Sequence, residues 1–199
     1  SAWDFLDKAK KQPRDGPIVN FLPSPTNVTG TMDALRAICH LEATSPPTWL
    51  RGIQGHDPRD LVSLRNGLFH IPTQELMAHT SEYFTINSLP FDWEPDASAP
   101  AWLSFLEQLW GDDQESIMTL QEIMGYLLTH DTSMQKIFKI IGPKRSGKGT
   151  IGRVIEGMIG SENVVGPTLA SLTQNFGLQP LVGKMVAMIA DARTPQSGK

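Results

Sequence analysis

The chain has 199 residues, of which 40% are hydrophobic and 19% charged, and its net charge is −4. This composition excludes an intrinsically disordered chain and is sufficient for one compact domain or two small ones. The apolar run at residues 185–190 is six residues long, too short to span a bilayer, so we expect no membrane segment. We find no secretion leader, and Cys39 is the single cysteine, so we expect a cytoplasmic protein without an internal disulfide.

Charge is divided unevenly along the chain. Residues 1–130 carry 8 basic and 17 acidic residues, a balance of −9, whereas residues 131–199 carry 9 and 4, a balance of +5. An acidic N-terminal part and a basic C-terminal part suggest two units with different roles, of which the basic one would attract an anionic ligand. Uneven sorting of charge without functional meaning remains the alternative.

Residues 1–130 are predicted to be mainly helical with one small β-hairpin. Thr31 has the side chain of an N-cap, and apolar residues follow it at helical spacing to about residue 43. The preceding stretch, residues 17–30, is rich in proline and asparagine and is expected to be irregular. Asn66-Gly67 lies between two alternating apolar runs and predicts the turn of a hairpin, because both residues tolerate a positive φ.

Two further helices are predicted behind an ordered loop. Proline and acidic residues dominate residues 83–100, and Phe91 and Trp93 would hold this loop against the core. Pro100 then begins one helix, and Asp112 or Asp113 caps the next. The aromatic residues of the first helix recur at helical spacing, which favours a core face over a base-stacking platform. The five histidines are scattered, which argues against a structural zinc site.

The stretch GPKRSGKGT, residues 142–150, has the pattern of a phosphate-binding loop. Residues 137–141 predict a strand before it, and residues 148–158 predict a helix after it. In such a loop successive backbone N–H groups and the helix dipole bind phosphate oxygens, and Lys148 would reach the β- and γ-phosphates. A glycine-rich turn without a ligand is the alternative. The predicted nucleotide-binding residues are Gly142, Pro143, Lys144, Arg145, Ser146, Gly147, Lys148, Gly149 and Thr150.

A magnesium ion bound with the nucleotide would need oxygen ligands from the protein. The usual pattern places Ser or Thr directly after the lysine, whereas here Gly149 occupies that position and Thr150 follows. Thr150 is therefore a predicted metal ligand with a weaker basis, since its hydroxyl would instead hold a phosphate oxygen or contact the metal through water.

A second candidate ligand follows the apolar run at residues 185–190. This run predicts a strand buried on both faces, and Asp191 directly follows it, where a P-loop ATPase places the acid that positions Mg²⁺ and water. Lys148 and Asp191 are thus the predicted catalytic residues, and Thr150 and Asp191 the predicted metal ligands. An acid that merely ends a strand is the alternative, and Ala192 stands where a second acid often follows.

Several longer stretches occur in a specific order: LVSLRNGLFHIPTQELMAHTSEYF, SLPFDWEPDASAPAWLSFLEQLWG, LQEIMGYLLT, QKIFKIIGPKRSGKGT and TLASLTQNFGLQPLVGKMVAMIADAR. Together they resemble the C-terminal region of phage and plasmid primases of the satellite-phage type, related to the poxvirus primase-helicase. The resemblance implies an α/β protein with a mainly helical domain over residues 1–130. Over residues 131–199 it implies the first half of a parallel-sheet, AAA+-like P-loop ATPase of helicase superfamily 3.

The resemblance also implies a function. Such proteins form an ATP-driven ring, expected to be a hexamer, that moves along single-stranded DNA and unwinds duplexes during replication in a bacterial host. ATP and Mg²⁺ are the implied cofactors. Residues 142–150 would be the Walker A loop, Asp191 the Walker B acid, and Arg193 would lie near the nucleotide.

The family's ATPase core continues with a pore loop, a sensor residue and an arginine finger, which the eight residues after Asp191 cannot supply. We therefore expect a helicase fragment that hydrolyses ATP weakly or not at all by itself. Two other functions remain open. A phosphotransferase of the nucleoside monophosphate kinase type would explain the GKGT ending, and a non-enzymatic partner-binding module would carry the loop as a vestige.

Overall fold

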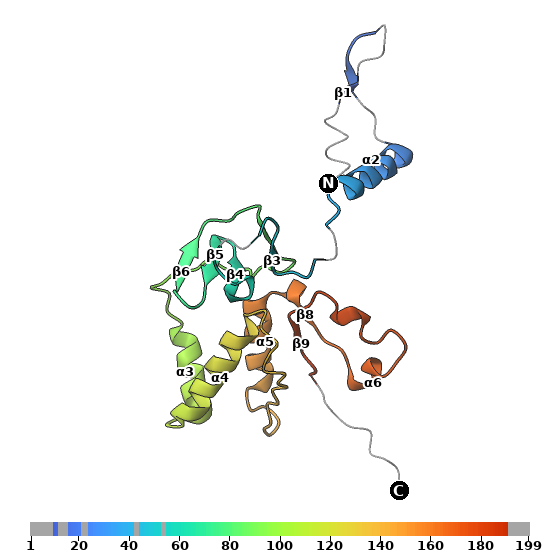
Figure 1. Ribbon diagram of the computed structural model, residues 1–199. Coiled ribbons are helices and arrows are strands. Elements are labelled where there is room, and N and C mark those ends of the chain that lie inside the picture. The colour runs from blue at the N-terminus through green and yellow to red at the C-terminus, as the bar shows by residue number, and fades with distance from the viewer. Residues whose placement is uncertain (1–9, 12–15, 21–23, 42–43, 53–54, 191–199) are drawn as a thin grey trace. The chain divides into compact units, whose positions relative to one another are not determined.

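A computed structural model describes residues 10–11, 16–20, 24–41, 44–52 and 55–190 (Figure 1). The chain divides into two compact units, Ser1–Thr44 and Ser45–Lys199. No helix within the described ranges combines the length and the apolar character that crossing a membrane requires. Asp191 and Arg193 lie outside the described residues.

The first unit contains a short antiparallel pair, β1 (Lys10–Lys11) with β2 (Val19–Asn20), and helix α2 (Pro25–Ile38). The prediction that Thr31 caps this helix is wrong. The helix begins about two turns earlier, because the Ser24 hydroxyl accepts a hydrogen bond from the Asn27 amide at 3.3 Å and proline occupies the first helical position. Thr31 lies inside the helix, where its hydroxyl donates to the Asn27 carbonyl.

The second unit opens with small antiparallel sheets. Strand β3 (Thr48–Trp49) pairs with β7 (Tyr83–Phe84), and the 3₁₀ helix η1 (Pro58–Asp60) leads into a three-stranded sheet. That sheet consists of β4 (Leu61–Leu64), β5 (Gly67–His70) and β6 (Glu75–Met77), in this order. The prediction of a mainly helical N-terminal part is wrong for residues 45–99, whose described part contains no α-helix. Their apolar residues instead form strands that are buried on both faces, in two separate clusters.

The predicted hairpin is confirmed, but its turn is shifted by one residue. Leu64 pairs with Gly67, so the two turn residues are Arg65 and Asn66, and Gly67 is the first residue of β5. Gly67 is required for a different reason from the one predicted. A Cβ there would collide with the Met77 carbonyl of the neighbouring strand β6.

The loop that follows β7 is held against this sheet, as predicted. The Asn66 side chain accepts from the Trp93 amide at 2.9 Å and donates to the Trp93 carbonyl at 3.1 Å. The Trp93 ring lies 4.1 Å from that of Phe69, centre to centre, and Phe91 packs against the same buried cluster. The hairpin turn and the loop therefore fix each other.

Three helices form the largest core of this unit: α3 (Pro100–Trp110), α4 (Gln114–Leu127) and α5 (Lys148–Ile159). The predictions that Pro100 begins α3 and that Asp113 caps α4 are confirmed. Hydrogen bonds from the Ser116 hydroxyl and amide hold the pKa of the Asp113 carboxyl below its usual range. One buried cluster joins the three helices: Leu106, Ile117, Leu120, Met124, Ile151, Ile155 and Ile159. A domain boundary at residue 130 stays a prediction.

The chain after α5 is irregular, with η2 (Ser161–Asn163), β8 (Val164–Val165), α6 (Leu169–Leu172), η3 (Gln179–Leu181) and β9 (Val186–Ala187). Strands β8 and β9 form the one parallel pairing of the described residues. The strand predicted at residues 137–141 does not form, since its backbone makes no hydrogen bond with any described residue. The parallel sheet expected of a P-loop ATPase is therefore not formed here, because strand pairing requires a neighbouring strand that these residues lack.

A buried pair of amide side chains ties the end of α5 to the loop after β7. Asn87 donates to the Asn163 side chain and to the Gly183 carbonyl, both at 2.9 Å. Asn163 in turn donates to the carbonyls of Ser88 and Ile159 at 2.9 and 2.8 Å. Because these groups are shielded from water, each hydrogen bond has to be made by the protein itself.

Substituting Gly67 by alanine is expected to lower the free energy of unfolding by about 2–3 kcal/mol, because the added methyl group forces β5 and β6 apart. Gly125→Ala in α4 is the matched control. A Cβ at that position meets nothing within 4 Å, and alanine favours a helix by up to about 1 kcal/mol over glycine. Urea unfolding followed by tryptophan fluorescence measures both, and equal effects would contradict the close contact with β6.

Asn163→Ala is expected to cost roughly 2–3 kcal/mol of unfolding free energy, because it leaves buried carbonyls without a donor. Asn66→Ala removes hydrogen bonds of the same kind at an exposed position and should cost about 1 kcal/mol or less. The same urea measurement compares the two variants. An Asn163→Ala protein as stable as Asn66→Ala would show that water replaces the lost bonds.

Candidate phosphate-binding site

The loop of residues 142–147 is shaped by two residues in the left-handed region. Arg145 has a φ of 64° and Gly147, the N-cap of α5, has a φ of 79°. These two turns reverse the chain between the extended segment 136–141 and the first turn of α5. The predicted helix at residues 148–158 is confirmed, with one additional residue at its end.

Lys148, the first residue of α5, folds back over the loop. Its ammonium group donates to the Gly142 carbonyl at 2.8 Å, to the Pro143 carbonyl at 2.6 Å and to the Ser146 hydroxyl at 3.2 Å. Among the residues that the structure describes, no carboxylate lies within ion-pair distance of it. The positive charge is therefore held by neutral oxygens, which an anion would replace with a gain in electrostatic energy.

Successive backbone amides of the loop lack a protein acceptor. The Thr150 and Ile151 amides donate to the Gly147 carbonyl at 2.9 and 3.0 Å, whereas those of residues 144–149 donate to no described residue. Unpaired amides at a helix N-terminus are donors for anions, and the helix dipole adds positive potential at the same place. The loop thus offers the groups that a phosphate chain needs.

The charges around the loop have one sign. Lys144, Arg145, Lys148 and Arg153 are the ionisable residues between positions 142 and 155, and no acidic residue lies in that interval. Lys144 and Arg145 are exposed, and neither forms an ion pair within the described part of the chain. A concentrated positive field of this kind attracts polyanionic ligands.

Gly142 lies at the N-terminal end of the loop. A Cβ on this residue would lie 2.7 Å from the Ser146 hydroxyl oxygen, too close for van der Waals contact, so Ser146 would have to rotate away. Its hydroxyl would then leave the ammonium of Lys148. By contrast, a Cβ on Gly149 would have 3.7 Å to its nearest neighbour, the Arg153 guanidinium. The two glycines of the motif are therefore not equivalent.

The role of Thr150 as a magnesium ligand stays a prediction. Its hydroxyl oxygen accepts a hydrogen bond from the Arg153 guanidinium at 3.1 Å, and a cation at this place disfavours a divalent metal on the same oxygen. No cluster of three metal-ligating side chains occurs among the residues described. Asp191 lies outside them, so its predicted role as catalytic acid and metal ligand stays a prediction.

The chain that leads to Asp191 does pass close to α5. Of the strand predicted at residues 185–190, only Val186–Ala187 (β9) forms, and it is not buried on both faces. Met188 follows β9, and its sulfur would lie 3.4 Å from a Cβ built on Gly152 of α5. The Met188 amide donates to the Val165 carbonyl at 2.8 Å, which continues the pairing of β8 with β9. The segment before Asp191 is thus packed on the helix that begins with Lys148.

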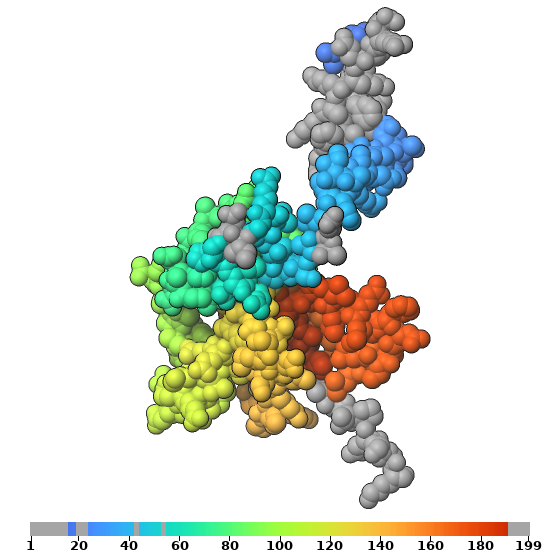
Figure 2. All heavy atoms as spheres, in the orientation of Figure 1, coloured from blue at the N-terminus to red at the C-terminus, as the bar shows by residue number. Residues whose placement is uncertain are grey.

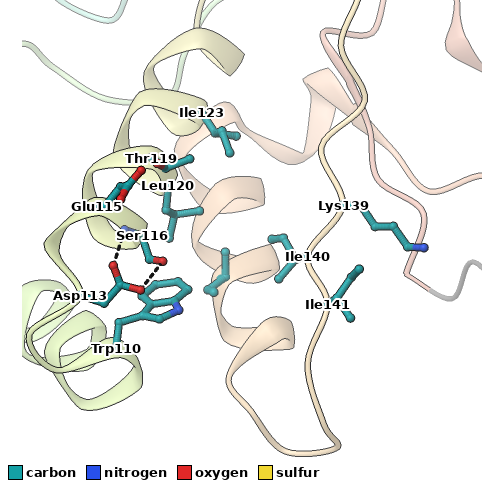
Figure 3. Close-up of a pocket in the computed structure, with 11 residues that line it drawn as sticks. Trp110, Asp113, Glu115, Ser116, Thr119, Leu120, Ile123, Lys139, Ile140 and Ile141 are labelled. Atoms are coloured by element: carbon teal, nitrogen blue, oxygen red, sulfur yellow. Dashed lines mark hydrogen bonds between the residues drawn. The ribbon is translucent and has the colours of Figure 1, made fainter.

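A groove of about 380 Å³ lies between α4, α5 and the extended residues 139–141 (Figure 3). Ile140 points toward the two helices, whereas Lys139 points away from them. Its lining is part apolar and part polar: Trp110, Leu120, Ile123, Ile140, Ile141 and Ile151 are the apolar residues, and Asp113, Glu115, Ser116, Thr119 and Lys139 the polar ones. The two carboxylates in this lining disfavour a phosphate there. Figure 2 shows the gold-coloured residues around 140 on the surface of this unit.

Comparison with known proteins matches a family model to residues that precede the phosphate loop. Residues 24–111 match the family model described as D5 N terminal like. This domain is found in phage and viral primase-helicases. No curated protein matches the chain. The match confirms the resemblance in part, because the D5 N terminal like stretch ends one residue after α3 and does not include the phosphate loop.

Gly142→Ala is expected to weaken binding of a nucleoside triphosphate about 5-fold, which corresponds to roughly 1 kcal/mol for the hydrogen bond lost when Ser146 rotates. Gly149→Ala, the same change in the same loop, should leave binding within about 2-fold, since ordinary surface substitutions have small effects. Titration with a fluorescent ATP analogue measures both.

A further comparison tests the stated cause. In a Ser146→Ala background, Gly142→Ala should have no additional effect, because the two changes remove the same contact and would be strongly non-additive. Independent, additive losses would show that Gly142 acts on the backbone and not through Ser146.

Proposed function

We propose that residues 142–150 bind the triphosphate of ATP and that the chain is the nucleotide-binding segment of a phage or viral replicative primase-helicase. The observation that carries this proposal is the combination of unpaired amides at residues 144–149 with the Lys148 ammonium held over them. Each of these groups would have a phosphate oxygen as a natural acceptor.

In this proposal Lys148 exchanges its two carbonyl acceptors for oxygens of the β- and γ-phosphates. The loop is already curved around the ammonium group, so the exchange needs only small movements of the side chain. The amides of the loop and of the first turn of α5 then surround the phosphates, and Lys144 and Arg145 raise the local concentration of the anion. ATP would be bound together with Mg²⁺, for which the predicted acid is Asp191.

The preceding D5 N terminal like stretch supports a helicase over a small phosphotransferase. Hydrolysis coupled to movement on single-stranded DNA, duplex unwinding and assembly into a ring are activities that we assign to the whole primase-helicase. The nucleoside monophosphate kinase alternative shares the GKGT ending, but no described residue outside the loop favours it.

The decisive experiment is an equilibrium titration with a fluorescent ATP analogue. Lys148→Ala should weaken binding about 10- to 100-fold, in keeping with a hydrogen bond to a charged group. Lys139→Ala removes the same charge from a side chain that points away from α4 and α5 (Figure 3) and should change affinity by no more than about 3-fold. Equal affinities for the wild type and Lys148→Ala would overturn the nucleotide site and favour the partner-binding module.

A second measurement separates the motor from a kinase. ATP turnover is followed with and without single-stranded DNA, and with AMP as a phosphoryl acceptor. Stimulation by DNA that disappears in Lys148→Ala supports the helicase. Phosphoryl transfer to AMP, or turnover indifferent to DNA, contradicts it.

A further inference from the structure

We infer that α3, the last helix of the D5 N terminal like stretch, positions the phosphate loop through Phe105 and Leu109. The functional consequence of this inference rests on the proposed nucleotide site. The structural part concerns the loop itself and does not depend on which ligand it binds. Phe105 and Leu109 are thus positioning residues, since they would not contact the ligand.

The contact is made at Gly147, the N-cap of α5. A Cβ built on this residue would lie 3.0 Å from Cδ2 of Leu109 and 3.0 Å from Cζ of Phe105, closer than ordinary van der Waals contact. Gly147 therefore has two independent reasons to be glycine: its φ of 79° and the absence of space above its Cα. The second reason comes entirely from α3.

The helix that provides this contact is itself firmly held. Phe105 and Leu109 are one helical turn apart and both pack on the core that Leu106 shares with α4 and α5. Leu106 is fully buried, and the ring of Phe105 stacks on Trp102 at a centre distance of 5.5 Å. Gly147 is therefore packed against a helix that the buried core holds in place.

The other end of the loop has no comparable support. The backbone of residues 136–141 forms no hydrogen bond with a described residue, and Ile137 and Ile141 are 96% and 79% exposed. The loop is therefore fixed by α3 at Gly147, whereas its other end is held by the Lys148 ammonium and by Phe138, whose ring lies 6.0 Å from that of Tyr126, centre to centre. Order in the amides of residues 144–149 depends on the contact at Gly147, so a change on α3 should be felt at the phosphate site.

Hydrogen exchange tests the contact without any nucleotide. Leu109→Ala is expected to increase exchange of the Thr150 and Ile151 amides, which donate to the Gly147 carbonyl, by about 10-fold or more, beyond what the loss of global stability produces. Leu106→Ala is the matched control on the same helix. Leu106 is more completely buried than Leu109, but none of its atoms is among the three nearest to a Cβ built on Gly147. Loop exchange that is as fast or faster in Leu106→Ala would overturn the inference.

A suppressor experiment tests the functional consequence. Gly147→Ala should weaken binding of the fluorescent ATP analogue about 10-fold or more, because strain at positive φ and a steric clash add together. Adding Leu109→Ala removes the contact with Leu109 but leaves the contact with Phe105 and the strain, so the double variant should recover about 3-fold and not fully. A purely structural role of Leu109 predicts the opposite, a double variant weaker than Gly147→Ala, and that result would overturn the inference.

The two measurements distinguish this inference from the proposed function. If the wild-type protein fails to bind the analogue, the nucleotide site is wrong, and the exchange comparison alone still decides whether α3 holds the loop. If the analogue binds but loop exchange does not respond to Leu109→Ala, the nucleotide site stands and the role of α3 is refuted.

Discussion

The packing of α5 against α3 and α4 is the constraint on which the rest of the second unit depends. Ile151, Ile155 and Ile159 lie on one face of α5 and are at most 5% exposed, and their burial supplies much of the favourable free energy of this region. The same packing sets the direction of the first turn of α5, and hence where the Lys148 ammonium and the neighbouring amides point. The chemistry of the loop is thus a consequence of an apolar core.

Much of the helical architecture could be predicted from the sequence because its signals are local. Proline at position 100, aspartate at 113 and apolar residues spaced along α3, α4 and α5 each specify an element within a few residues. The prediction that Thr31 caps α2 is wrong because Ser24-Pro25, an N-cap residue followed by proline, begins the helix earlier. The strand predicted at residues 137–141 is wrong because an apolar run indicates only a preference for burial, whereas a strand also needs a neighbouring strand to pair with.

The candidate site, too, could be predicted only where its sequence signal is local. The motif alone named the loop residues, since glycines and a lysine at fixed spacing reflect backbone geometry within one turn. It contained no information about Phe105 and Leu109, which are distant in the sequence and reach Gly147 only through the packing of α3. Nor could it show that the Thr150 hydroxyl is taken by Arg153, because one turn of helix allows several pairings and the sequence does not choose among them.

The unpaired segment 136–141 has a consequence for the behaviour of the protein in concentrated solution. An extended apolar run with free backbone groups is a template for pairing with the same segment of another molecule. Lys139 interrupts the run in its centre and Lys136 precedes it. Copies stacked in register would bring these like charges about one strand spacing apart, roughly 5 Å, at a cost in repulsion. The two lysines therefore act as gatekeepers that oppose aggregation at this edge.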